Sequence, residues 1–484
     1  MSSSLALTQT AFRPSADETL FCDLVVVGDT LAAYSAAIAI LQAGGRVCWV
    51  KAGGLTTGLA DLDDRASPLQ ALERRFPRTA IAPAQFCLSA RQHQFWRQWR
   101  SWQQWPAVEP PGALDSPPPT APLPELPTEV SRAIAPYLST HQLVLILQAQ
   151  PLRVLHSATR QRRRVYQVVF RDRRTGQPFR IHAKLTLDAT PQGTLGQSLT
   201  AGAPVETVLK LTTDHLAPLK RGAARGACFD DTIGLAIALS PHPEARRLRP
   251  VTLPLRSLVP LHTEGYLCVS QPGTTPDLAD MVQTPLVQWG LGEAAGFVAV
   301  QALQAQQPLD LLVQTQDWLR RVQGGLVQAG IPLFWFDDVG HHDLDFAAIQ
   351  SLAVVDSMRT MRDRDLSFRP ETPVTRAVVA SALVRLLKKP ACTPSEPLSD
   401  VTPYHWAFSA IQTVVATGLM PVLADRTFGP DRVLTQRELW ETLRAVSPDA
   451  PLTTDTLETA APDESPARRR HLARWLYPFL RDRQ

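Results

Sequence analysis

The chain has 484 residues, of which 44% are hydrophobic and 19% are charged, and its formal net charge at pH 7 is +4. This length suits two or three domains of ordinary size. The small positive charge argues against nucleic acid as the main partner.

The cysteines and the N-terminus bear on the compartment. Six cysteines are scattered without CxxC spacing or a histidine cluster, which argues against a metal site or a disulfide framework and favours a reducing compartment. The first residues lack the basic and long apolar segments of a secretory signal, so no such signal is expected. Residues 1–20 are expected to form a disordered N-terminus. Asp29 interrupts the most apolar window, residues 24–41, which therefore predicts a strand and a helix instead of a transmembrane segment. Together these features predict a cytoplasmic protein.

A βαβ pattern opens the first domain. Residues 24–27 form an apolar run typical of a buried parallel strand, Gly28 predicts a tight turn, and residues 31–43 and 46–50 predict a helix and a second strand. The N-terminus of such a helix directs backbone N–H groups towards a pyrophosphate. Further along, residues 164–188 alternate like an antiparallel hairpin that ends in an apolar strand.

Three later segments complete a family pattern. They are AGGLTTGLADLDD from Ala52, LDATPQGTLGQSLTAGAP from Leu187 and LGEAAGFVAVQAL from Leu291. With VVVGDTLAAYSAA at the start, they resemble FAD-dependent oxidoreductases of the two-dinucleotide-binding-domain type, over residues 20–305. The resemblance implies an α/β, Rossmann-like FAD/NAD(P)-binding fold with an inserted β-hairpin over residues 21–330, and FAD as the cofactor. The cofactor-binding positions that it implies are Gly28, Asp29, Thr30, Ala33, Lys51, Gly53, Gly54, Asp188 and Gly292.

Four of these positions differ from the family pattern. Thr30 and Ala33 stand at the second and third glycine positions, where the family accepts replacements. Asp29 adds a carboxylate beside the expected pyrophosphate. The two negative charges repel each other unless the Asp29 side chain points away. Lys51 replaces the acid that accepts hydrogen bonds from the ribose, and a lysine has no acceptor. The sequence therefore predicts a partly degenerate dinucleotide site.

The sequence predicts neither a substrate pocket nor catalytic residues on the substrate side of the first domain. A proline-rich loop is predicted at residues 106–127, and the substrate cap, residues 205–261, is short, which leaves no shaped pocket that excludes water. His182, His215 and His262 are isolated, and the acidic pairs near Asp63 and Asp230 are typical of turns or caps. The catalytic residues therefore stay unknown, and no metal site is expected.

The C-terminal part contains an internal repeat. Segments from Phe336 and from Leu398 share an Asp-Val pair, an amphipathic helix around FAAIQ or FSAIQ, a Phe-x-Pro turn and a threonine that caps a second helix. They resemble S-layer homology (SLH) domains. The resemblance implies an all-α repeat domain with copies at residues 331–390 and 397–447. In that family the arginine after the threonine helps to hold an anionic cell-wall glycan. The positions implied for a glycan or a protein partner are Arg376, Trp406 and Arg437, since Gln436 takes the arginine position in the second copy.

The remaining tail, residues 448–484, predicts a basic amphipathic helix and no third SLH motif. Its run Arg468–Arg470, like Arg160–Arg164, is either a solvated face or a contact for an anionic partner or a membrane surface.

Two functions stay open at this point. The first is an FAD-dependent oxidoreductase with an unknown redox substrate. The second is a non-catalytic scaffold that has lost FAD, whose SLH-like repeats bind a protein partner or cell-envelope glycan. The second function places the protein at the cell envelope.

Overall fold

This computed structural model describes most of the chain in twelve segments. They are residues 11–55, 88–97, 126–158, 162–196, 232–239, 248–260, 263–270, 285–336, 338–358, 367–394, 397–446 and 462–481. The described residues divide between two compact units, one ending at Ile331 and the other beginning at Pro332.

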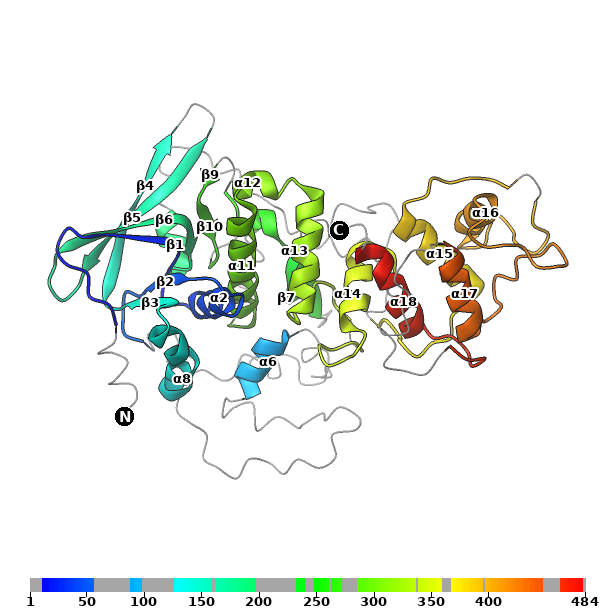
Figure 1. Cartoon of the computed structure of the whole chain (residues 1–484), viewed down its shortest axis with the longest axis horizontal. Coiled ribbons are helices and arrows are strands. Elements are labelled where there is room, and N and C mark those ends of the chain that lie inside the picture. Colours follow the sequence, from blue (N-terminus) through cyan, green and yellow to red (C-terminus); the bar gives the residue numbers. More distant parts are fainter. Residues whose placement is uncertain are drawn as a thin grey trace, which may run out of the picture. The chain divides into compact units, whose positions relative to one another are not determined.

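One sheet organises the first unit (Figure 1). Its order is β3-β2-β1-β6-β5-β4, with β10 beside β6 and β9 beside β5. The strands are β1 (Thr19–Val27), β2 (Val47–Val50), β3 (Leu143–Ile146), β4 (Ala149–Ala158), β5 (Arg163–Asp172), β6 (Pro178–Asp188), β9 (Thr263–Glu264) and β10 (Tyr266–Cys268). Strands β3, β2, β1, β6 and β10 pair in parallel, so their carboxyl ends share one edge. The α/β Rossmann-like class predicted from the sequence is confirmed.

The first strand begins earlier than the apolar run indicates. Thr19 and Leu20 pair with Arg180 and Ile181 of β6, and the backbone N–H of Phe12 donates to the carbonyl of Leu145 at 2.8 Å. Residues 11–20 were expected to belong to a disordered terminus, and this expectation is wrong for them. The long strand β6 supplies backbone partners that a reading of local hydrophobicity does not detect.

Two helices that meet through small residues cover one face of the parallel strands. Helix α2 (Leu31–Gln42) is buried from Leu31 to Leu41, as expected for a helix that is apolar on every side. Helix α11 (Pro285–Ala305) packs on it. A Cβ atom at Gly292 would lie 2.1 Å from the carbonyl oxygen of Ala32, so the glycine lets the two backbones touch.

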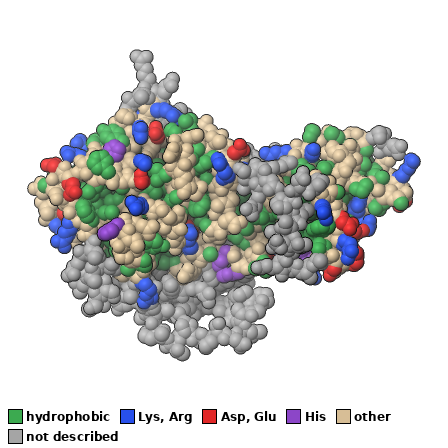
Figure 2. All heavy atoms as spheres, viewed as in Figure 1, with side chains coloured by type: hydrophobic (Ala, Val, Ile, Leu, Met, Phe, Trp, Pro, Cys, Tyr) green, Lys and Arg blue, Asp and Glu red, His purple; other side chains and the backbone are tan. Residues whose placement is uncertain are grey.

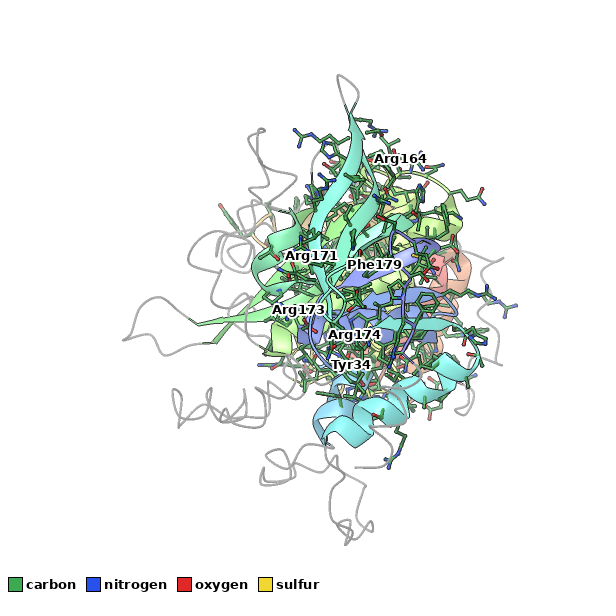
Figure 3. All side chains as sticks on the ribbon, turned by 90° about the vertical axis from the view of Figure 1, so that its left-hand side faces the viewer. Tyr34, Arg164, Arg171, Arg173, Arg174 and Phe179 are labelled. Carbon is green, nitrogen blue, oxygen red and sulfur yellow. The ribbon has the colours of Figure 1, made fainter. Side chains whose placement is uncertain are left out.

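The antiparallel strands cover the other face. Val27 of β1 and Val50 of β2 belong to the same buried cluster as Phe170 of β5 and Phe179 of β6. The two phenylalanine rings stack with centroids 5.3 Å apart. The predicted hairpin is therefore confirmed as β5 and β6, and Figure 3 shows Arg164 and Arg171 towards opposite ends of β5.

The remaining helices of this unit are α6 (Ala90–Arg97), α8 (Leu126–Ser139), α12 (Leu309–Leu312) and α13 (Gln316–Gln328). Helix α8 takes in the last two residues of the predicted loop 106–127, and the rest of that loop lies outside the described residues. Within the predicted cap, β7 (Thr232–Leu239) and β8 (Leu248–Pro254) form a separate antiparallel pair. The positions of Asp63, His215, Asp230 and His262 also lie outside the described residues.

The regular elements described in the second unit are helices. They are α14 (Phe346–Val354), α15 (Arg376–Leu387), α16 (Phe408–Ala416), α17 (Gln436–Val446) and α18 (Arg469–Arg481). Three short segments, each just before α15, α17 or α18, meet at their centre through isolated β-bridges. No helix among the described residues is both long and apolar enough for a membrane span.

The centre of the second unit has approximate threefold symmetry. The N–H of Leu434 donates to the carbonyl of Val374 at 3.0 Å, that of Val374 to Ala467 at 2.8 Å, and that of Ala467 to Leu434 at 2.8 Å. These three side chains are at most 1% exposed. The tail therefore supplies a third arm, and the expectation that it holds no third motif is wrong. The equivalence escapes a reading of the sequence because Arg468 stands where the other arms have threonine.

Candidate functional site

Segments far apart in the sequence meet at the carboxyl edge of the parallel strands. The N–H of Gly28, after β1, donates to the carbonyl of Val50 at 3.0 Å, and the N–H of Ala189, after β6, donates to Val27 at 2.8 Å. Gly28 has φ of +142°, and a Cβ atom there would lie 2.0 Å from the carbonyl oxygen of Ala189. Only glycine fits this turn, because both its backbone angle and its neighbour exclude a side chain.

Thr30 closes the same turn and starts the next helix. It is the N-cap of α2, where its Oγ1 accepts from the N–H of Ala33 at 3.3 Å and donates to the carbonyl of Ala189 at 2.8 Å. Ala33 is fully buried. Thr30 therefore links the β1 turn to the β6 turn at the second glycine position, and Ala33 serves packing.

Asp29 and Lys51, the two residues that differ most in chemistry from the family pattern, form one ion pair. The Nζ of Lys51 lies 3.5 Å from Oδ1 of Asp29. The Asp29 carboxylate also accepts from the N–H groups of Ala52 at 3.1 Å and Gly53 at 3.4 Å. Its charge is therefore compensated by the loop that follows β2, in which Gly54 is half-buried.

The lysine of this pair is enclosed by the protein. Lys51 is 0% exposed, and its Nζ lies 4.7 Å from the ring centroid of Trp49. Burial lowers the pKa of Lys51 to about 8, against the opposing attraction of Asp29. Residue 51 thus points into the protein in this chain and offers no acceptor to a ribose.

Asp188 holds the end of β6 to its surroundings. Its carboxylate accepts from Thr190 N at 3.0 Å, Thr190 Oγ1 at 2.5 Å, Gly196 N at 2.9 Å and Tyr266 Oη at 2.5 Å. Burial raises the pKa of Asp188, and these hydrogen bonds oppose the rise. The aspartate orders the loop after β6 and ties it to β10. Gly292 lies elsewhere, in the contact between α11 and α2.

The sequence reasoning missed a buried cluster beside this edge. The ring of Tyr34 lies 6.1 Å from that of Trp49 and 5.8 Å from those of Phe95 and Trp289. Next to it, Glu293 is 1% exposed and accepts from Ser89 Oγ at 2.5 Å and Trp289 Nε1 at 3.2 Å. Burial raises the pKa of Glu293. The sequence signal for this cluster was Glu293 itself, an acid inside the apolar segment LGEAAGF.

In the second unit, two repeat motifs have the same internal role. The carboxylate of Asp400 accepts from the N–H groups of Phe428 at 2.9 Å and Gly429 at 2.6 Å. Asp338 does the same for Phe368 at 2.7 Å and Arg369 at 2.6 Å. The aspartate of each Asp-Val pair therefore holds the Phe-x-Pro turn of its own repeat.

Arg376, the position that matches the glycan-binding arginine, is also internal. It donates from Nε to the carbonyl of Phe428 at 2.7 Å and from Nη2 to that of Pro421 at 2.6 Å. It is 6% exposed, and burial lowers its pKa. Arg469 in the third arm repeats the contact, with Nε 2.8 Å from the carbonyl of Phe368. Burial lowers the pKa of Arg469 to about 10.

The other two positions implied for partner binding lie at the surface. Arg437 pairs with Glu464 at 2.6 Å, and both side chains are more than half exposed. Trp406 is 65% exposed, and its neighbour Tyr404 is 97% exposed. The structure therefore does not bring Arg376, Trp406 and Arg437 into one exposed site.

The basic tail faces acids of the first repeat. Arg474 donates to Asp345 at 2.6 and 3.0 Å, and Arg470 contacts Asp343 at 3.3 Å and Glu371 at 2.6 Å. Arg468 also pairs with Glu371. In the view of Figure 2, acidic and basic side chains of this unit lie next to one another. Arg469 is 5% exposed, so it does not belong to a solvated face, whereas Arg468 is 53% exposed in its pair with Glu371.

Comparison with known families assigns both parts of the chain. Residues 23–217 match the family of FAD dependent oxidoreductases, and residues 397–439 match the S-layer homology domain. The chain therefore combines an FAD-dependent oxidoreductase region with a C-terminal SLH region, as the motifs predicted. The match covers the second repeat, whereas the first repeat rests on its equivalence to the second.

No curated protein matches the sequence. Solved structures resemble it distantly. THI4 of Thermovibrio ammonificans is 12% identical, with 59% of this chain and 91% of that chain covered and a TM-score of 0.30. A geranylgeranyl bacteriochlorophyll reductase-like protein of Thermoplasma acidophilum is 9% identical, with 82% and 96% covered and a TM-score of 0.28. Glycerol-3-phosphate dehydrogenase of Bacillus halodurans, complexed with FAD, is 13% identical, with 39% and 38% covered and a TM-score of 0.21.

Proposed function

We propose that residues 21–330 bind FAD as an oxidoreductase-type domain with an altered ribose end, and that the SLH unit attaches this domain to the cell envelope. The observation that supports the first part most is the pairing of Asp29 with Lys51. An unpaired carboxylate beside a pyrophosphate would repel it, but this carboxylate is compensated by a cation and two backbone N–H groups.

The residues fit one half of the cofactor site better than the other. The glycine turn at Gly28 and the N-terminus of α2 suit a pyrophosphate, because helix N-termini favour negative charge. The ribose hydroxyls find no acceptor at Lys51. FAD, when bound, supplies the electron transfer, and the chain contributes the turn, the helix N-terminus and the buried pair. The redox substrate stays open.

A second function is favoured by a specific observation. Asp29, Thr30 and Asp188 each make hydrogen bonds within the chain, so the edge is held together without a ligand. This supports the alternative in which the domain is a non-catalytic scaffold. The SLH region then provides the function by binding envelope glycan or a protein partner, and it favours the cell envelope over the cytoplasm.

The visible absorption spectrum of the purified full chain, before and after incubation with FAD and gel filtration, separates the two functions. We expect bound flavin to co-elute with the protein and to give absorption bands near ~370 and ~450 nm. A colourless protein that takes up no FAD would overturn the flavin proposal and favour the scaffold.

A double variant, Asp29→Gly with Lys51→Glu, restores the family pattern. We expect it to bind FAD at least about tenfold more tightly, since hydrogen bonds to a charged group contribute ~1.5–3 kcal/mol. Exchange of the exposed pair Asp23 and Lys184, which lie 2.7 Å apart on the same sheet, is the matched control and should leave FAD binding unchanged. Equal affinity of the double variant and the wild type would show that a glutamate at position 51 does not turn towards the ribose.

A further inference from the structure

The positive charge of the chain is concentrated in β4, β5 and β6. Residues 149–188, which hold these strands, contain ten lysines and arginines and two acids, a net charge of +8, whereas the whole chain has +4. The rest of the chain is therefore net negative. The two acids of the span, Asp172 and Asp188, are 6% and 0% exposed. The span thus presents cations at the surface, while its own acids are buried.

Three of these arginines have no acidic partner among the described residues. Arg153 of β4, Arg171 of β5 and Arg173 in the turn after β5 are exposed, and no acid in the described part of the chain forms an ion pair with them. Figure 3 shows Arg171 and Arg173 at the same end of the hairpin. In contrast, Lys184 of β6 pairs with Asp23 at 2.7 Å. The charge of the three arginines is therefore available to a partner.

The strand register places arginines and apolar residues on one face of the sheet. Alternate residues of a strand point to the same side, and paired residues of neighbouring strands share that side. The register from β1 through β6 and β5 to β4 therefore gives one continuous surface, opposite to the buried cluster of Phe170 and Phe179. We call this surface the outward face. Its residues include Phe21, Arg153, Gln167, Val169, Arg171 and His182.

Exposed apolar side chains stand beside the cations. Phe21 on β1 is 76% exposed, and its ring lies 5.4 Å from that of His182 on β6. Leu152, the extra residue at the register shift of β4, is 40% exposed and precedes Arg153. Aromatic and aliphatic side chains next to arginines are typical of proteins at the boundary between lipid headgroups and acyl chains.

This combination matches the surface of an anionic bilayer. Phosphate headgroups attract guanidinium groups that lack an acidic partner, and the headgroup boundary accepts exposed apolar side chains. Single-stranded nucleic acid needs ring faces for stacking, to which Leu152 adds nothing, and a protein partner is typically held by anchors in a fitted pocket. We propose that the outward face docks the first unit on an anionic phospholipid bilayer. The proposal goes beyond FAD binding and does not depend on it.

Co-sedimentation of the full chain with phosphatidylcholine vesicles, with and without about one-third phosphatidylglycerol, tests the proposal. We expect binding to the anionic vesicles alone, and weaker binding as the salt concentration rises, because salt screens the charges. Each arginine near such a surface strengthens binding about fivefold. Arg153→Gln, Arg171→Gln and Arg173→Gln together should therefore weaken binding about a hundredfold.

A second triple variant with the same loss of charge is the control. Arg46, Arg321 and Lys389 are also exposed but belong to other elements, so their replacement by glutamine should leave binding nearly unchanged. Phe21→Ser should weaken binding about tenfold at low and at high salt, since salt does not screen an apolar contact. All these variants should keep the melting temperature, because the side chains are exposed.

Three outcomes would overturn the proposal. Equal weakening by the two triple variants would mean a general attraction of charge, without a docking face. Wild-type affinity of Phe21→Ser would mean that no apolar side chain of this face enters the bilayer. A wild type that binds a single-stranded oligonucleotide but no anionic vesicles would assign the face to nucleic acid. FAD uptake, measured separately, should be the same in the wild type and in every variant, so it tests the flavin proposal independently.

Discussion

The Nζ of Lys51 lies 3.5 Å from Oδ1 of Asp29, and the lysine side chain has no exposed surface. Removing one partner from a buried ion pair leaves an uncompensated charge, which costs ~3–5 kcal/mol, whereas replacing both by neutral groups is often nearly neutral. The pair is therefore expected to show strong energetic coupling.

A double-mutant cycle measures that coupling. We expect Lys51→Met to lower the free energy of unfolding by about 3 kcal/mol or more and Lys51→Met with Asp29→Asn to recover most of the loss. Urea unfolding of the four proteins gives the coupling energy. The exposed pair Lys184 and Asp23 is the control, with an expected coupling of ~0–1 kcal/mol. Additive effects at positions 29 and 51 would contradict a coupled pair.

The same lysine predicts a pH dependence. Its pKa is lowered from 10.5 to about 8 in the folded protein. Between these values the unfolded chain binds more protons at this site than the folded protein does, so stability rises with pH, by roughly 3 kcal/mol in total. Unfolding of the wild type and Lys51→Met from pH 7 to 10.5 isolates the contribution. A constant difference between the two proteins would rule it out.

Gly292 tests the contact between α11 and α2. Its Cβ would lie 2.1 Å from the carbonyl oxygen of Ala32, so Gly292→Ala should cost ~1–3 kcal/mol through overpacking. Gly234→Ala is the control, because its Cβ would lie 3.9 Å from the nearest atom, Leu253 Cδ1. Thermal unfolding should show a loss for the first variant alone. Equal melting temperatures would mean that the helices separate without penalty.

The tail should be necessary for the second unit. Arg474→Gln removes the two-point partner of Asp345, whose side chain is 1% exposed, and leaves it Arg470 Nη1 at 3.2 Å. We therefore expect the free energy of unfolding of this unit to fall by ~1.5–3 kcal/mol, the contribution of hydrogen bonds to a charged group. Arg437→Gln removes the exposed pair with Glu464 and should change stability by less than ~1 kcal/mol.

Ala467→Asp places a carboxylate at the buried centre and should unfold the helices, as measured by circular dichroism. An unchanged helical signal would show that the third arm is dispensable.

Local patterns in the sequence were sufficient to predict several helices and strands of the fold. The helix predicted at residues 31–43 is α2 (Leu31–Gln42), and the strand predicted at residues 46–50 is β2 (Val47–Val50). Both were visible because hydrophobic periodicity and glycine positions act over a few residues. The extension of β1 to Thr19 was not visible, because it depends on pairing with β6 far along the chain.

The candidate site was predictable as a set of positions but not as a set of contacts. Asp29 and Lys51 were each recognised as differing from the family pattern, yet their pairing needs β1 and β2 side by side. Arg376 was recognised as a motif arginine, yet its burial follows from the fold of the second repeat around it.

By itself, the sequence determined the opening βαβ unit, the hairpin, the two family assignments and the residues at the motif positions, because these depend on side-chain type and spacing. Only the tertiary structure decided that Asp29 neutralises Lys51 and that the tail closes the SLH unit as a third arm. It alone also showed Arg376 buried and Trp406 exposed. Burial and charge compensation depend on neighbours that are distant in sequence, and folding alone brings them together.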